Sequence, residues 1–228
     1  MDKKQRADLG ESLVESIGNS EISDITTEAW DLAIDTFLED GVLKDIPVIG
    51  WAVKALKARQ SVRDALFLKK IVMFLIAASE ISAEEKENFT IKINQDKNYR
   101  QKVGENLLLL IDRHERIEKS LLLGRLFAAH IKNELSHEQF MRLSTALDRS
   151  VIEDLEVLNK RRANYFMVPK ITREGLYRSG LMDMRIEVPE MDPRLAGKGL
   201  NTKGKYDYEM NDLGKAFIKY AFEPLESE

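Results

Sequence analysis

The sequence predicts a mainly α-helical protein, with a helical body followed by a small C-terminal α+β module that has the element order of a winged helix. Few helix-breaking residues, with 5 prolines and 12 glycines in 228 residues, favour helices. Helix-start signals and apolar residues at steps of three or four fill the middle of the chain. Near residue 160 this pattern gives way to two short alternating segments typical of strands. We therefore divide the chain into an acidic N-terminal helical segment (1–44), a helical body (45–160) and a winged-helix-like module (161–228).

The N-terminal segment is distinguished by its charge. Residues 8–43 contain ten acidic residues and neither Lys nor Arg, whereas residues 44–70 and 160–205 are predominantly basic. Such blocks either pair with each other across the fold or present each basic block to an anionic partner. The charged start, MDKKQRADLG, lacks the apolar stretch of a signal peptide, so we expect a cytoplasmic protein. The chain has no cysteine, which excludes disulfides, thiolate metal sites and cysteine nucleophiles.

Residues 45–70 predict a basic amphipathic helix, which Asp45 caps and in which Pro47 takes an early position. Its apolar face consists mainly of small residues, so it suits either close packing in the core or contact with an anionic membrane or partner surface. The candidate contact residues are Trp51, Lys54, Lys57, Arg59 and Arg63. The longest charge-free apolar run, residues 71–79, is far shorter than the roughly 20 residues that span a bilayer. We therefore predict no transmembrane span.

The middle of the chain carries two capping boxes, Ser82 with Glu85 and Ser136 with Gln139. Residues 103–131 contain two leucine clusters around a polar stretch, which indicates either two packed helices or one long helix. After the second box one apolar stripe continues to about residue 160 and predicts a single buried helix face. Its members are Phe140, Leu143, Leu147, Val151, Leu155 and Leu158.

The last third predicts helix, strand, turn-rich loop, strand and helix. The first helix is expected to begin at a Thr172 cap and to end at Gly180. Residues 184–188 and 206–210 alternate as strands do, and Asn211 or Asp212 caps the final helix.

The candidate contact residues of this module are mostly basic. On the exposed side of its first helix we expect Arg173, Tyr177 and Arg178, and on the loop and second strand Arg194, Lys198, Lys203 and Lys205. These side chains suit either a protein partner or phosphate contacts on DNA. Because the chain has a net charge of −4, we favour a protein partner and keep a DNA-binding regulator as the alternative.

Catalytic motifs are incomplete. Residues 199–206, GLNTKGKY, match the spacing of a phosphate-binding loop, but Tyr206 replaces its Ser or Thr, and strand-like residues follow where a helix should begin. His137 and Glu138 begin a zinc-protease motif whose second histidine is replaced by Met141. We interpret all three histidines as solvated or adjacent to helix caps. The sequence therefore predicts a non-enzymatic binding protein without cofactor or metal.

The order of these parts resembles the bacterial Abi-alpha family, which is associated with abortive infection. The matching segments are NLLLLIDRHERIEKSLLLGRLFAAHI (106–131), GLYRSGLM (175–182) and YEMNDLGKAFIKYAF (208–222), together about a fifth of the chain. The resemblance implies a role in phage defence or on a prophage.

Overall fold

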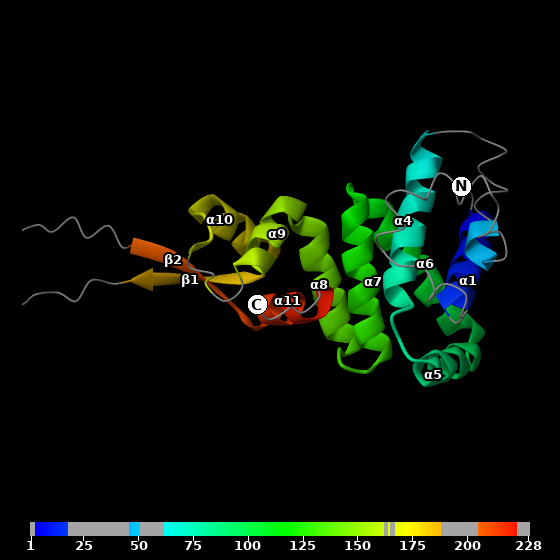
Figure 1. The fold of residues 1–228 in the computed structure, drawn as a ribbon. Coiled ribbons are helices and arrows are strands. Elements are labelled where there is room, and N and C mark those ends of the chain that lie inside the picture. The colour runs from blue at the N-terminus through cyan, green and yellow to red at the C-terminus, as the bar shows by residue number, and fades with distance from the viewer. Residues whose placement is uncertain are drawn as a thin grey trace, which may run out of the picture. The chain divides into compact units, whose positions relative to one another are not determined.

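The computed structural model describes residues 3–17, 46–50, 62–161, 164, 167–187 and 205–222. It is mainly helical, with a two-stranded antiparallel sheet near the C-terminus (Figure 1), so the predicted fold class, a helical body with a small α+β module, is confirmed. The described residues form two compact units, which divide between Asp148 and Arg149. The last residues of the final helix group with the first unit.

In the described part of the first unit, α4 packs along α7 and α1 packs along α6 (Figure 1). The bounds of its described helices are α1 Lys3–Ile17, α4 Val62–Ala78, α5 Ala83–Asn94, α6 Lys97–Arg113, α7 Ile117–Ile131 and α8 His137–Arg149. Apolar side chains that are fully buried, among them Phe74, Leu123 and Leu147, form its core.

Glycines allow the two helices of each pair to approach closely. A Cβ on Gly124 of α7 would lie 2.4 Å from the carbonyl oxygen of Phe74 on α4. A Cβ on Gly104 of α6 would lie 2.3 Å from the carbonyl oxygen of Gly10 on α1. Neither separation is sterically allowed, so each helix crossing requires a glycine, which has no Cβ, at this position.

Both predicted capping boxes are confirmed. At the start of α5 the Glu85 backbone N–H donates to Ser82 Oγ at 3.2 Å, and the Ser82 N–H donates to the Glu85 carboxylate at 2.7 Å. Ser136 and Gln139 make the same reciprocal pair at the start of α8. The leucine-rich stretch is two helices, α6 and α7, which are separated at His114.

The predicted apolar stripe after residue 140 is wrong at one position. Helix α8 ends at Arg149 and a new helix, α9 (Ile152–Lys160), begins after Val151. Val151 is the N-cap of α9 and is 56% exposed, because the break in the helix rotates it out of the apolar face. The other five members of the stripe are buried.

The second unit contains α9, α10 (Lys170–Ser179), strands β1 (Met182–Glu187) and β2 (Lys205–Met210), and most of α11 (Asp212–Ala221). The strands pair antiparallel, with Met182 opposite Met210 and Ile186 opposite Tyr206.

The helix ends of this unit are partly as predicted. Gly180 ends α10 with a φ of +89°, a left-handed conformation that favours glycine. Asn211 caps α11, since its side-chain oxygen accepts the Gly214 N–H at 2.9 Å. The predicted Thr172 cap is wrong: Pro169 is the N-cap of α10, and Thr172 is buried one turn inside the helix.

No helix in the described part of the chain is long and apolar enough to cross a membrane. Lys205 begins a strand rather than a helix, so the described end of the loop-like 199–206 motif lacks the helix that a phosphate-binding loop requires. Residues 199–204 of that motif lie outside the described residues.

Candidate functional site

The structure describes five of the twelve predicted contact residues. Arg173, Tyr177 and Arg178 lie on α10, Lys205 is the first residue of β2, and Arg63 is exposed near the start of α4. The others lie outside the described residues: Trp51, Lys54, Lys57, Arg59, Arg194, Lys198 and Lys203.

Arg173 is held by a carboxylate of the same unit. Its guanidinium forms a hydrogen-bonded ion pair with Asp207 on β2, and the arginine side chain is only 14% exposed. A phosphate would have to displace this carboxylate before it could bind Arg173. Arg178, one turn and a half further along α10, is exposed.

Lys170, at the start of α10, is directed at an aromatic ring of β2. Its Nζ lies 4.3 Å from the centre of the Tyr206 ring and donates to the Tyr206 hydroxyl at 3.3 Å. The hydrogen bond to Tyr206 raises the pKa of Lys170. The lysine therefore remains positively charged and lies across one side of the ring.

Three exposed side chains lie on one face of the two-stranded ribbon, and we call them the ribbon patch: Met184, Ile186 and Tyr206. Ile186 and Tyr206 are direct partners across the strands, and Met184 is two residues from Ile186, so the pleat places all three on one side. Their exposed fractions are 42%, 62% and 46%.

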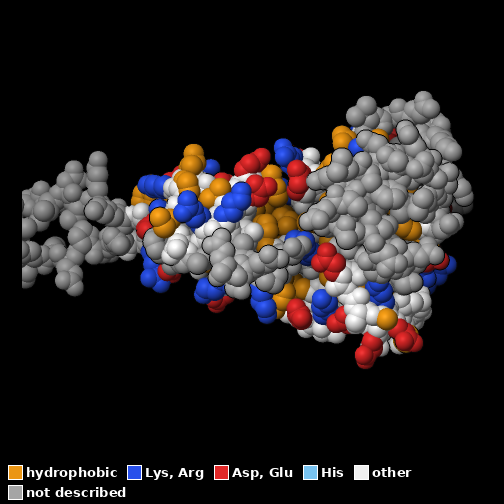
Figure 2. All heavy atoms as spheres, in the orientation of Figure 1, with side chains coloured by type: hydrophobic (Ala, Val, Ile, Leu, Met, Phe, Trp, Pro, Cys, Tyr) orange, Lys and Arg blue, Asp and Glu red, His pale blue; other side chains and the backbone are white. Residues whose placement is uncertain are grey.

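Further exposed apolar residues lie on the preceding helix. On α10, Ile171 is 78% exposed, and the Tyr177 ring packs 5.3 Å from the ring of Tyr208 on β2. Figure 2 shows hydrophobic side chains intermixed with Lys and Arg over α10 and the adjoining strands. The exposed surface is amphipathic rather than purely basic.

The opposite face of the ribbon is charged but balanced. Arg185 on β1 forms an ion pair with Glu209, which lies two residues along β2 from Asp207, the direct partner of Arg185. Asp183 accepts a hydrogen bond from the Asn211 side chain at 3.0 Å. Charges that are paired within the ribbon attract an external polyanion only weakly.

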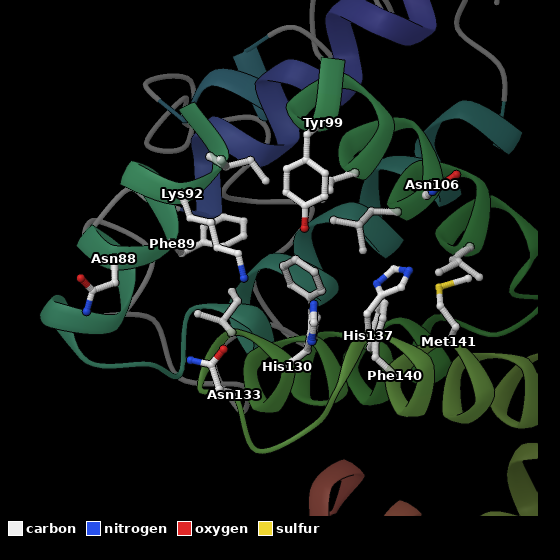
Figure 3. Close-up of a pocket in the computed structure, with 16 residues that line it drawn as sticks. Asn88, Phe89, Lys92, Tyr99, Asn106, His130, Asn133, His137, Phe140 and Met141 are labelled. Carbon is white, nitrogen blue, oxygen red and sulfur yellow. The ribbon is translucent and has the colours of Figure 1, made fainter. Parts of the chain in front are cut away.

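A second candidate site is a cavity of about 110 Å³ inside the first unit. Side chains of α5, α6, α7 and α8 line it, and its floor is apolar, with Phe89, Phe127 and Phe140 packed edge to face at ring separations of 5.5–5.9 Å. Around the opening lie Lys92, Tyr99 and His137, which point into the same space in Figure 3, together with Asn88, Asn106 and Asn133.

Sequence periodicity does not reveal this cavity, because four helices contribute to it. A weak local signal existed. Lys92 lies one turn after Phe89 on α5, and Phe140 lies one turn after His137 on α8, so each helix offers one aromatic and one basic side chain on the same face. Periodicity alone does not separate such a face from an ordinary boundary between core and solvent.

His130 is fixed at the floor of the cavity. Its Nδ1 donates to the Leu135 carbonyl oxygen at 2.9 Å, and its ring stacks on Phe140 at 5.5 Å. Burial lowers the pKa of His130 below its ordinary value, although the hydrogen bond to Leu135 opposes the shift. The imidazole is therefore neutral at pH 7, and its Nδ1 proton is engaged in the hydrogen bond to Leu135.

His114 lies elsewhere in the first unit and is fully buried. As the C-cap of α6 it has only 1% of its surface exposed, and its Nδ1 lies 3.3 Å from Ser120 Oγ. Burial, with added repulsion from Lys119 and Lys70, lowers the pKa of His114 to about 3. All three histidines lie at helix ends, and His114 is a buried cap residue rather than a solvated one.

No group of three or more His, Asp or Glu side chains among the described residues is arranged to hold a metal ion. Comparison of the chain with models of known protein families, with characterised proteins and with solved structures gives no match.

Proposed function

We propose that this chain is a non-catalytic, cytoplasmic binding protein whose C-terminal module contacts a protein partner through the ribbon patch and the exposed side of α10. The observation that carries the proposal is the pairing of exposed apolar residues, Ile186 with Tyr206, on a ribbon where Arg185 is already paired with Glu209. Exposed apolar clusters of this kind are typical of surfaces that dock on proteins.

The chemistry of the partner follows from the rim of the patch. Lys170 and Arg178 are exposed at the two ends of α10, and Glu174 between them is half-buried. A complementary surface would combine apolar side chains with carboxylates. Such charges at the rim favour the rate and specificity of association more than its affinity.

A winged-helix DNA-binding regulator is the second candidate. The order of α10, β1, β2 and α11 and the exposed Arg178 support it. The ion pair between Arg173 and Asp207 weighs against it, because one of the three predicted phosphate contacts on α10 is already occupied. We therefore place DNA second.

The resemblance to the Abi-alpha family supplies the proposed biological setting, which is defence against phage. In that setting the protein partner would be a phage or host component. We expect bacteria that carry the gene to resist a phage that this system recognises, and we expect Ile186→Ser to abolish the resistance without lowering the protein level.

Photo-crosslinking from two positions tests the contact surface. A photoreactive amino acid replaces Ile186 in the patch or Val151, which is similarly exposed (62% and 56%) in the same unit but lies outside the patch. We expect one cross-linked protein from position 186 and none from position 151. The captured protein is then purified and titrated with the wild type, Ile186→Ser and Val151→Ser.

We expect Ile186→Ser to weaken the complex about tenfold or more, since central apolar contacts dominate interfaces, while Val151→Ser leaves it within about twofold. Equal affinities of the two variants would overturn the assignment of the surface. Cross-links to nucleic acid instead of protein from position 186 would favour the regulator.

A further inference from the structure

The floor of the cavity in the first unit sets the size and character of what could fill it. Aromatic rings and aliphatic side chains, among them Phe127, Leu107 and Leu110, line its base and are largely buried. For comparison, an engineered apolar cavity of about 150 Å³ takes up benzene. A cavity of about 110 Å³ therefore suits a single ring or a short branched chain.

The rim sets the charge of the ligand. Among the described residues that line the cavity there is one lysine and no aspartate or glutamate. Lys92 forms no ion pair with another residue that the structure describes, and its amine points inward with the Tyr99 hydroxyl (Figure 3). Since Lys can only donate hydrogen bonds, the group that meets it must accept them.

The number of cations limits the choice of anion. The Lys92 ammonium and the Tyr99 hydroxyl can each donate a hydrogen bond to one of the two oxygens of a carboxylate. His130 is neutral at pH 7, so it adds no second positive charge, and its Nδ1 proton already donates to the Leu135 carbonyl oxygen. A phosphate, with its higher charge, is usually met by several cations or by a row of backbone N–H groups.

We infer that this cavity binds a small carboxylic acid whose apolar body, a ring or a short branched chain, fills the aromatic floor while its carboxylate meets Lys92 and Tyr99 at the rim. The inference concerns the first unit alone and does not depend on the partner proposed for the ribbon patch. The protein would then hold a small metabolite in addition to its protein contact.

Three compounds of nearly equal shape and different charge test this inference: phenylacetate, phenylacetamide and phenethylamine. Each is titrated into the full chain at pH 7 and followed by ligand-observed NMR and calorimetry. We expect saturable binding of phenylacetate, about tenfold weaker binding of the neutral amide and no binding of the amine. Equal affinity for the three compounds, or no saturable binding of phenylacetate, would overturn the inference.

Variants then locate the site. Lys92→Gln removes the rim charge and should weaken phenylacetate binding about tenfold while leaving phenylacetamide unchanged. Lys102→Gln is the matched control, because Lys102 is also exposed but does not line the cavity, and it should bind as the wild type does. Val103→Phe should fill the cavity and exclude both compounds. If Lys92→Gln and Lys102→Gln bind phenylacetate equally, the acid is not held at this rim and the inference fails.

Discussion

The cavity of the first unit and the ribbon patch of the second both combine apolar and charged side chains, but in opposite arrangements. In the cavity the aromatic rings are recessed, and Lys92 at the rim has no carboxylate among the lining residues. On the ribbon Ile186 and Tyr206 are exposed, and carboxylates of β2 pair with Arg185 of β1 and with Arg173 of α10.

This difference indicates what each region can bind. A recessed apolar floor with an uncompensated cation selects a small anion, because the ligand is surrounded and its charge is met at close range. An exposed apolar ribbon whose charges are paired should bind a small anion or a polyanion only weakly. It gains most from another apolar surface that covers it, which a protein can provide.

The largest expected effect is the difference in the free energy of unfolding between a variant at a buried position and a variant at an exposed one. Leu147 on α8 is fully buried, so Leu147→Ala should lower the free energy of unfolding by about 2–5 kcal/mol. Ile186→Ala on the ribbon should change it by less than about 0.5 kcal/mol, since that side chain is mostly exposed. Urea denaturation measures both values. A similar loss in the two variants would show that the ribbon patch is a packed surface and not an open one.

The next effect concerns pH. His114 titrates near pH 6.5 when the chain is unfolded, but its pKa is lowered to about 3 in the folded protein. Protonation therefore favours the unfolded chain. The contribution of His114 to stability should be complete above pH 6.5 and should be lost as the pH falls toward 3, by up to about 1.4 kcal/mol per pH unit.

Carboxylates titrate in part of the same pH range, so the contribution of His114 is measured as the difference between the wild type and a variant that lacks the imidazole. Urea denaturation of the wild type and of His114→Gln is repeated from pH 7 to pH 4, and the dependence on pH should be weaker in the variant. Parallel curves would contradict a buried, neutral imidazole at this position.

A smaller effect tests the close helix contact of the first unit. Gly104→Ala should lower the free energy of unfolding by about 1–3 kcal/mol, because the added Cβ would meet the Gly10 backbone at 2.3 Å. Gly175→Ala is the matched control in α10. There the added methyl meets only the end of the Asp154 side chain, which can move, so thermal unfolding should be nearly unchanged. Equal changes in melting temperature would place the α1 and α6 backbones further apart than described.

The smallest effect concerns the module's own ion pair. Asp207→Asn should lower stability by only about 0.2–1 kcal/mol, the usual range for a pair with an exposed partner. The substitution also releases Arg173, so any weak affinity for DNA should rise in this variant. Unchanged DNA binding in Asp207→Asn would mean that the ion pair does not restrain Arg173.

Features set by neighbouring residues could be predicted from the sequence. The capping boxes at Ser82 and Ser136 and the left-handed end of α10 at Gly180 depend on a few adjacent positions. The stripe that included Val151 could not be predicted fully, because the apolar spacing continues through a break between two helices.

The sites were harder to predict than the elements. The cavity is lined by α5, α6, α7 and α8, and no local sequence pattern indicates that Lys92, Tyr99 and His137 line the same cavity. Arg173 was predicted on an exposed helix side, but whether it is free depends on Asp207, which lies on a strand 34 residues away. Such partners follow from tertiary packing and not from spacing along the chain.

The most direct test of the central claim, that the second unit is a protein-binding and not a nucleic-acid-binding module, is a titration of the full chain with duplex DNA at physiological salt. We predict no saturable binding up to about 100 μM, a concentration at which non-specific DNA binders already bind. Micromolar binding that weakens with salt and is lost in Arg178→Ala, but is unaffected by Ile186→Ser, would contradict it.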